Sequence, residues 1–131
     1  MGVKNIITLS IARNQNHLDG FLSIVDQRVA VTYPYITPDI IYEELGKRGF
    51  EFVEIPSFEE KINFAANSVA LEPGRIIMPK GSPRTVELLQ KKGIEVIELD
   101  LDEIKKGGGS VHCLTAFLKR DDIPVYEVEE E

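Results

Sequence analysis

Hydrophobic and acidic residues alternate in two short segments of the chain, FEFVEIP at 50–56 and IEVIELD at 94–100. Alternation of this kind predicts β-strands with one solvated face. A segment with apolar residues at helical spacing precedes each of them. Its apolar positions are Ile40, Ile41 and Leu45 in the first case and Val86, Leu88 and Leu89 in the second. The pattern therefore predicts a helix followed by a strand at two places.

The boundaries of the two predicted helices carry matching signals. A hydroxyl residue followed by proline precedes each helix, at Thr37–Pro38 and Ser82–Pro83. We expect the hydroxyl to cap a free backbone N–H and the proline to occupy the first helical position. Each helix should end at a glycine, Gly49 or Gly93, because basic residues precede a glycine there and suit a helix C-terminus.

Two further strand patterns precede each helix, so that the unit strand, strand, helix, strand occurs twice, with a period of about 45 residues. The second strands contain RVAVTYP at 28–34 and RIIMPKG at 75–81. The fold class is therefore α/β, with ββαβ modules that arose by duplication, or else two unrelated α/β segments. Flanking strands are expected at 5–12, NIITLSIA, and at 110–118, SVHCLTAFL, as parts of neighbouring units in a larger assembly.

The length of 131 residues predicts one domain, residues 1–131. The formal net charge of −7 argues against nucleic acid as a partner, because binding phosphates requires clustered basic residues. No apolar run is long enough to span a membrane, and we recognise no signal peptide at the N-terminus. With a single cysteine, the chain is expected in the cytoplasm.

That cysteine, Cys113, follows three glycines and stands beside His112. In the predicted strand 110–118, neighbouring side chains point to opposite faces, so His112 is not expected to act as the base for Cys113. It is expected to pack on the far face of the strand, or else to line the mouth of the site. The glycines can adopt positive φ and allow backbone to approach a ligand, or they form a plain flexible loop. They do not match a phosphate-binding loop, and one cysteine with two histidines makes no zinc spacing, so neither metal nor cofactor is expected.

The other histidine, His17, stands two residues before Asp19. If both lie in a strand, they project from the same face as a general acid or base beside a carboxylate. The alternative is a loop histidine followed by a turn-forming aspartate.

Two segments of the chain together resemble a known superfamily. These are HLDGFLSIVDQRVAVTYP at 17–34 and GGGSVHCLTAFLKRD at 107–121. They are similar to the histidine and cysteine motifs of the guanidino-group-modifying enzymes, which include arginine deiminases, agmatine and peptidylarginine deiminases, and amidinotransferases. The resemblance implies the pentein fold, a five-bladed α/β propeller of ββαβ modules. The chain would be the C-terminal part of it, with about two full modules plus flanking strands.

The resemblance also implies roles for individual residues. Cys113 would be the nucleophile that forms a covalent amidino-thioether intermediate, and His17 the acid and base. Asp19 would bind the guanidinium nitrogens through both carboxylate oxygens, while Gly108 and Gly109 would let substrate and backbone approach the sulfur. The implied reaction is hydrolysis of arginine or a related guanidino compound to a ureido product and ammonia. Transfer of the amidino group to an amine is the alternative.

Some of the expected machinery has no counterpart in this sequence. The family's FEGGD-like acidic motif does not occur here. We therefore expect another protein chain, or further copies of this one, to complete the site, so that the chain acts as part of a split or reduced enzyme. The alternative of another class is a non-catalytic binding or assembly module. Arg13, Asn67 and Arg120 are further candidates to position substrate.

Overall fold

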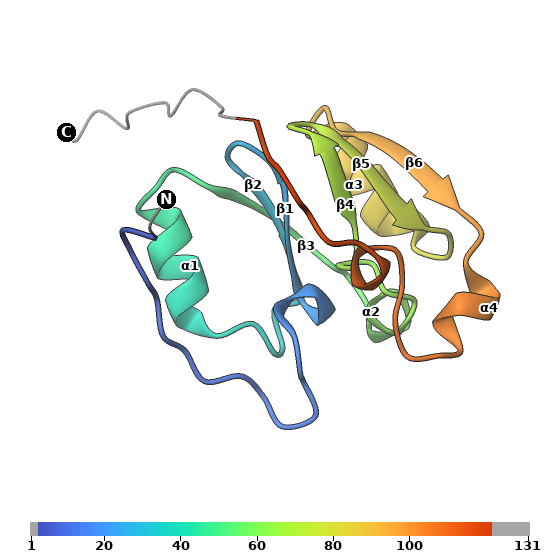
Figure 1. Ribbon diagram of the computed structural model, residues 1–131, viewed down its shortest axis with the longest axis horizontal. Helices are drawn as coiled ribbons and strands as arrows, with labels where there is room; N and C mark the ends of the chain where they lie inside the picture. Colours follow the sequence, from blue (N-terminus) through green and yellow to red (C-terminus); the bar gives the residue numbers. More distant parts are fainter. Residues whose placement is uncertain (1–2, 122–131) are drawn as a thin grey trace.

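The computed structural model describes residues 3–121, which form two modules of the same construction (Figure 1). The first module comprises strands β1 (Leu22–Asp26), β2 (Val29–Thr32) and β3 (Glu51–Glu54) with helix α1 (Asp39–Gly46). The second comprises β4 (Val69–Glu72), β5 (Arg75–Pro79) and β6 (Glu95–Leu99) with helix α3 (Pro83–Lys91). Short helices complete the chain: η1 (Leu18–Gly20), α2 (Phe58–Ile62), α4 (Asp102–Lys105) and η2 (His112–Leu114). Within residues 3–121, no helix is long and apolar enough to cross a membrane.

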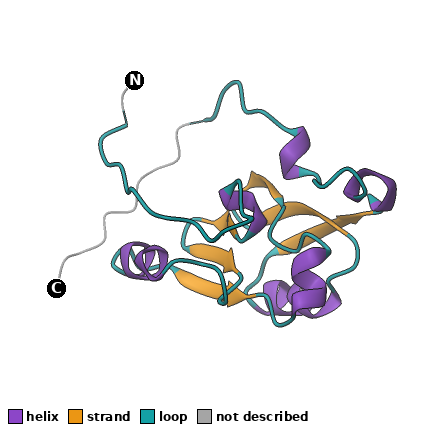
Figure 2. Cartoon of the chain, turned by 90° about the horizontal axis from the view of Figure 1, so that it is seen from below, coloured by secondary structure: helices purple, strands orange, loops and turns teal. Residues whose placement is uncertain are grey.

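Each module builds its own three-stranded sheet (Figure 2). The first two strands pair antiparallel, and the strand after the helix joins the second one in parallel. Both hairpins carry a register shift just before the turn, between Ile24 and Asp26 in one and between Ala70 and Glu72 in the other. The predicted α/β fold with a repeated ββαβ module is confirmed.

One hydrophobic core joins the two modules. Helix α1 covers one side of the first sheet, where the ring of Tyr42 lies 4.8 Å from that of Phe52. Because side chains alternate along a strand, Val53 points to the opposite side of that sheet. Helix α3 packs there, in contact with β3 as well as with β6 of its own module. Val53 and Leu89 of α3 are both buried in the shared core.

The two glycines predicted at the helix ends close the turn that follows each helix, three residues after α1 and two after α3. Gly49 has a φ of +76° and Gly93 a φ of +79°, a conformation that glycine adopts without steric cost. The residue after each glycine donates its N–H back to a carbonyl in the helix, from Phe50 to Leu45 and from Ile94 to Leu89, both at 3.1 Å. The chain thereby leaves each helix directly into the parallel strand.

The predicted hydroxyl caps are wrong. Thr37 donates its hydroxyl to the carbonyl of Tyr33, and α1 begins only at Asp39. At α3, proline does occupy the first turn, but Ser82 makes no capping bond. The cap comes from Glu60 of α2, whose carboxylate accepts from the N–H groups of Arg84 and Thr85 and from the Thr85 hydroxyl. A carboxylate at a helix N-terminus satisfies free donors and suits the helix dipole.

The two predicted flanking strands are also wrong. Residues 5–12 form no strand and pair with none among residues 3–121. Residues 112–114 form the short 3₁₀ turn η2 instead, in which the N–H of Thr115 donates to the carbonyl of His112. A strand is stable only where a neighbour satisfies its backbone groups, and the described part of the chain offers none at either place.

We expect Glu60→Gln to destabilise the chain by about 1–2 kcal/mol, because a neutral amide accepts less well from the backbone N–H groups and the interaction with the helix dipole is lost. Glu60 is 4% exposed, whereas its neighbour Glu59 is exposed and its side chain accepts no bond from residues 3–121. Glu59→Gln is therefore the matched control. Urea unfolding measures both variants, and equal stabilities would contradict the assigned cap.

Candidate functional site

Cys113 lies in the turn η2, on a segment that passes between the two modules (Figure 1). Its thiol is free and the residue is exposed. The predicted glycine turn precedes it: Gly107 and Gly108 donate their N–H groups to carbonyls of α4, and Gly108 has a φ of +85°. This turn reverses the chain after α4 and brings Cys113 back to the first module.

Gly109 allows the backbone to pass close to Cys113. A Cβ at this position would lie 3.2 Å from the Cβ and 3.3 Å from the Sγ of Cys113, tighter than an ordinary van der Waals contact. Close packing against Cys113 therefore explains why residue 109 is a glycine. The roles of Gly108 and Gly109 in substrate binding stay predictions.

Asp19 and Cys113 meet although 94 residues separate them. The Sγ of Cys113 lies 3.5 Å from Oδ2 of Asp19, with the thiol as donor. The same oxygen lies 2.9 Å from Nδ1 of His112. The Asp19 side chain is only 17% exposed, and that of His112 is 40% exposed. One carboxylate oxygen thus contacts both the thiol and an imidazole.

This pair suits a planar cation. A thiol can donate to the carboxylate, but a thiolate at the same distance would face a like charge. An amidinium or guanidinium ion bound between them removes this repulsion, because it donates N–H groups to the carboxylate and presents its carbon to the sulfur. The geometry therefore favours reaction of the sulfur with cationic amidines over neutral electrophiles.

The structure corrects the expectation for His112. Of its two expected placements, the far face of a strand is wrong, because the strand is not formed and the turn η2 places His112 and Cys113 against the same carboxylate. In a 3₁₀ turn, successive side chains are about 120° apart rather than on opposite faces. His112 contacts Asp19 and does not contact the sulfur within hydrogen-bond distance.

The side chains of His17 and Arg13 take no part in these contacts. Residues 18–20 form the turn η1, so the shared strand face predicted for His17 and Asp19 does not exist. The side chains of His17 and Arg13 are exposed, and neither makes a hydrogen bond or ion pair with residues 3–121. The acid–base role of His17 and the substrate role of Arg13 stay predictions.

Asn67 was a candidate to position substrate, but the contacts it makes to the cysteine segment were not predicted from the sequence. Its side chain is 1% exposed and lies against the cysteine segment instead of an open site. Its Nδ2 donates to the Sγ of Cys113 at 3.1 Å, and its Oδ1 accepts the backbone N–H of His112 at 2.8 Å. The available signal in the sequence was a polar pair, Asn67–Ser68, between apolar residues on both sides.

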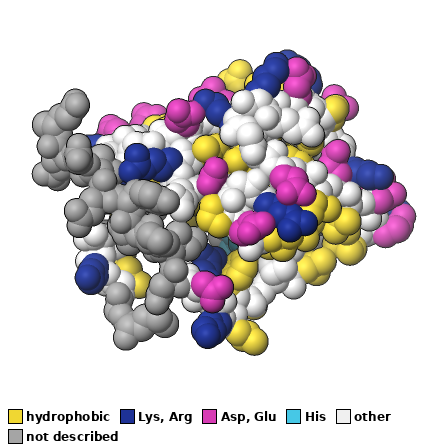
Figure 3. Space-filling view, turned by 90° about the horizontal axis from the view of Figure 1, so that it is seen from above, with side chains coloured by type: hydrophobic (Ala, Val, Ile, Leu, Met, Phe, Trp, Pro, Cys, Tyr) yellow, Lys and Arg dark blue, Asp and Glu magenta, His cyan; other side chains and the backbone are white. Residues whose placement is uncertain are grey.

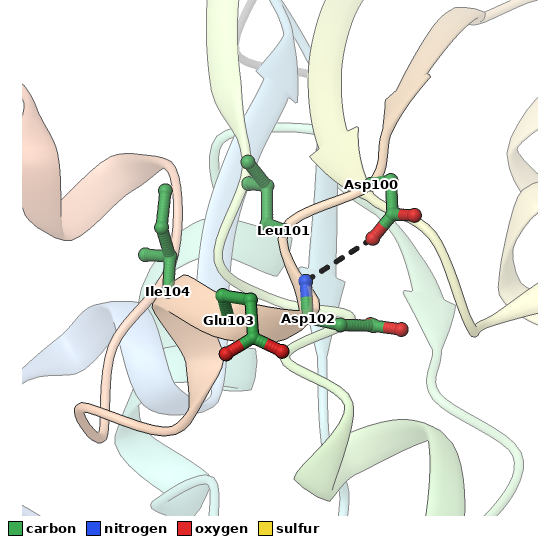
Figure 4. A pocket seen from close by; sticks show the side chains of 5 residues that line it. All are labelled: Asp100, Leu101, Asp102, Glu103 and Ile104. Atoms are coloured by element: carbon green, nitrogen blue, oxygen red, sulfur yellow. Dashed lines mark hydrogen bonds between the residues drawn. The ribbon is translucent and has the colours of Figure 1, made fainter.

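A surface hollow of about 560 Å³ lies beside α4 and contains none of these residues (Figure 4). Consecutive residues 100–104 line it, and the N–H of Asp102 donates to the carboxylate of Asp100 there. Because one chain turn forms it, it does not bring distant groups together. Residues 3–121 hold no group of three or more His, Cys, Asp and Glu side chains placed to bind a metal ion.

The family pattern of arginine deiminase matches residues 37–120, which is more than half of the chain. The chain therefore belongs to the arginine deiminase family. The match includes Asn67 and Cys113, while Asp19 lies outside it.

Known relatives agree with this assignment. An uncharacterized protein of Bacillus subtilis, YkgA, is 31% identical over 118 residues, which cover 89% of this chain and 40% of YkgA. The structure of ArgZ, an arginine dihydrolase from cyanobacteria, superposes with a TM-score of 0.68 at 25% identity over 83% of this chain and 17% of ArgZ. DDAH from Pseudomonas aeruginosa, solved as a cysteine-to-serine mutant with citrulline, gives a TM-score of 0.58 at 29% identity over 76% of this chain and 35% of that one. The predicted partial pentein fold is confirmed.

We expect Asp19→Asn to remove a preference of Cys113 for cationic reagents. Chloroacetamidine is a cation and chloroacetamide its neutral analogue, so the ratio of their alkylation rates isolates the contribution of the carboxylate. Loss of the charge-assisted contact should lower that ratio about tenfold. Mass spectrometry of Cys113 follows both reactions.

The control for this measurement is Asp39→Asn, which makes the same change of charge at an exposed position of α1. Its ratio should equal that of the unaltered chain. An Asp19→Asn ratio equal to the control would contradict the role of Asp19 at the sulfur.

Proposed function

We propose that this chain is the cysteine-bearing component of an enzyme that hydrolyses arginine or a related guanidino compound to a ureido product and ammonia. The observation that carries the proposal is the contact between the Cys113 sulfur and the Asp19 carboxylate, in a chain of the arginine deiminase family. The chain spans 40% of YkgA and smaller shares of ArgZ and DDAH, so the complete activity requires groups beyond those described above.

In this mechanism, Asp19 binds two nitrogens of the guanidinium group and holds its carbon against the sulfur. The thiolate of Cys113 forms a C–S bond to that carbon, and the C–N bond to the leaving nitrogen breaks after a proton transfer to it, which releases ammonia. Water then attacks the amidino-thioether. A C–O bond forms, the C–S bond breaks, and the sulfur returns as the thiolate beside the ureido product.

His17 is the proposed acid and base of these proton transfers, since it stands two residues before Asp19 at the start of η1. His112 is proposed to orient Asp19 through its Nδ1 contact. Hydrolysis is preferred to amidino transfer because DDAH, which is 29% identical, was solved with citrulline, a ureido compound. That observation concerns the relative and supports the same product class for this chain.

The central test measures citrulline and ammonia from arginine, with the chain alone and with the protein that completes its site. Cys113→Ala should abolish turnover and the covalent adduct. His17→Gln should lower turnover at least about a hundredfold, because acid–base groups contribute that much, while alkylation of Cys113 by chloroacetamidine continues. Turnover retained in Cys113→Ala, or unchanged in His17→Gln, would contradict the respective role.

One apolar face of the second sheet is partly exposed, whereas the corresponding face of the first sheet is buried. The pair Val31 and Val53 in the first sheet corresponds to Ile77 and Ile97 in the second, by strand register. In the first sheet this side is buried under α3. In the second sheet the corresponding side is partly exposed, and Leu71 and Leu99 on it are 52% and 40% exposed. Hydrophobic side chains also reach the surface between charged ones in Figure 3.

Helix α1 contacts a sheet on one side only, and its other side is partly exposed. Leu89 of α3 is fully buried because that helix lies between two sheets, whereas the equivalent Leu45 of α1, which contacts one sheet only, is half-buried. We therefore propose that α1 of a second copy packs on the open face of the second sheet, repeating the contact of α3 with the first sheet. Such a head-to-tail contact continues into a ring or a chain of copies.

Sedimentation velocity tests this association. We expect the unaltered chain to form concentration-dependent oligomers, and the double variant Leu71→Ser, Leu99→Ser to be monomeric, because it makes the proposed contact polar. Ile24→Ser is the control, since Ile24 is 45% exposed on β1 but lies outside this face. A monomeric unaltered chain, or oligomers that persist in the double variant, would contradict the contact.

A further inference from the structure

Asn67 makes two hydrogen bonds to the cysteine segment, and their donors fix the orientation of its amide. The backbone N–H of His112 can only donate, so the atom 2.8 Å from it is the carbonyl oxygen Oδ1. The NH₂ group then faces the sulfur of Cys113 at 3.1 Å. The side chain is 1% exposed, which leaves it no face for a substrate. One buried amide thus holds both the backbone and the sulfur of the turn η2.

The position of Asn67 is itself fixed by the surrounding chain. Phe64 adopts a φ of +63°, and the N–H of Asn67 donates to its carbonyl at 2.9 Å, which closes a tight turn after α2. The next residue, Ser68, exchanges a hydroxyl hydrogen bond of 2.7 Å with Ser23 on β1. Strand β1 directly follows the turn that carries Asp19. Asn67 and Ser68 therefore connect the two halves of the site.

We propose that Asn67 is a positioning residue that holds the Cys113 sulfur at Asp19 and stabilises its negative charge with an N–H donor. This assignment rests on the proposed function, in which that sulfur is the nucleophile. Among the side chains of residues 3–121 in hydrogen-bond contact with the sulfur, Asn67 donates and Asp19 accepts. A thiolate repelled by the carboxylate before substrate binds needs such a donor, because an unpaired charge in a protein is costly.

The variant Asn67→Asp separates the two contacts. Its carboxylate still accepts the N–H of His112, but it presents no donor to the sulfur and adds a negative charge beside it, whereas Asn67→Ala removes the donor without adding charge. We expect alkylation of Cys113 by iodoacetamide at neutral pH to slow about tenfold or more, and the pH profile of the reaction to move to higher pH. Asn67→Ala, which loses both contacts, should also be slow. Asn5→Asp makes the same change at an exposed position and should leave the rate unchanged.

A measurement on the unaltered chain tests the inference even if Asn67→Asp does not fold. The side-chain amide signal of Asn67 in NMR spectra should shift with pH together with the thiolate absorbance of Cys113, and this shift should vanish in Cys113→Ser. A structural role alone would leave the amide signal independent of the state of the sulfur. An Asn67→Asp chain that is folded and alkylates at the unaltered rate, or an amide signal that ignores the thiolate, overturns the inference.

The experiment also separates this inference from the proposed function. Alkylation and the amide signal require no turnover, so they report on Asn67 even in a chain that hydrolyses no guanidino compound. If the completed enzyme does turn over arginine, Asn67→Asp should lower kcat with little change in KM, because Asn67 contacts the nucleophile and not the substrate. A rise in KM at unchanged kcat would overturn the positioning role and leave the proposed function intact.

Discussion

The packing of α3 between the two sheets is the interaction on which the rest of this structure depends. This helix buries Leu89 against the core that both modules share, and its first turn is capped by Glu60 from the connecting segment. Apolar contact and a buried carboxylate cap thus act on the same helix. Because α3 fixes the second sheet against the first, it also fixes where the chain after β6 can return, and this return carries Cys113 to Asp19.

The resulting site consists of a few groups, and two of them, the Cys113 sulfur and the Asp19 carboxylate, repel each other when both are negatively charged. The sulfur and the carboxylate of Asp19 lie 3.5 Å apart, which suits a thiol but not a thiolate without a cation or another donor. The amide of Asn67 supplies a donor from the buried side, and a bound guanidinium would supply charge from the open side. Selectivity for cationic substrates would then come from the Asp19 carboxylate.

Local chemistry could be predicted from the sequence, while long-range partners could not. The glycines at 49 and 93 close the turns after their helices with positive φ, a conformation that is favourable for the residue itself. The hydroxyls of Thr37 and Ser82 did not cap: Thr37 donates to the carbonyl of Tyr33, four residues earlier, and Ser82 donates to the carbonyl of Glu60, a long-range partner 22 residues earlier. The strand predicted around Cys113 failed for the same reason: Asn67, 46 residues earlier, holds that segment in a turn. The pair Asp19 and Cys113 was predicted from resemblance, and His112 was misplaced because its position depends on that turn.

The central claim is that Asp19 and Cys113 act together on an amidinium group. A crystal structure of the chain after alkylation of Cys113 by chloroacetamidine tests it most directly, because the reagent leaves an amidinium on the sulfur. The account predicts that both nitrogens of this group lie within hydrogen-bond distance of the Asp19 carboxylate, with His112 still on Oδ2. An amidinium that points to solvent, with the carboxylate contacting His112 alone, would contradict it.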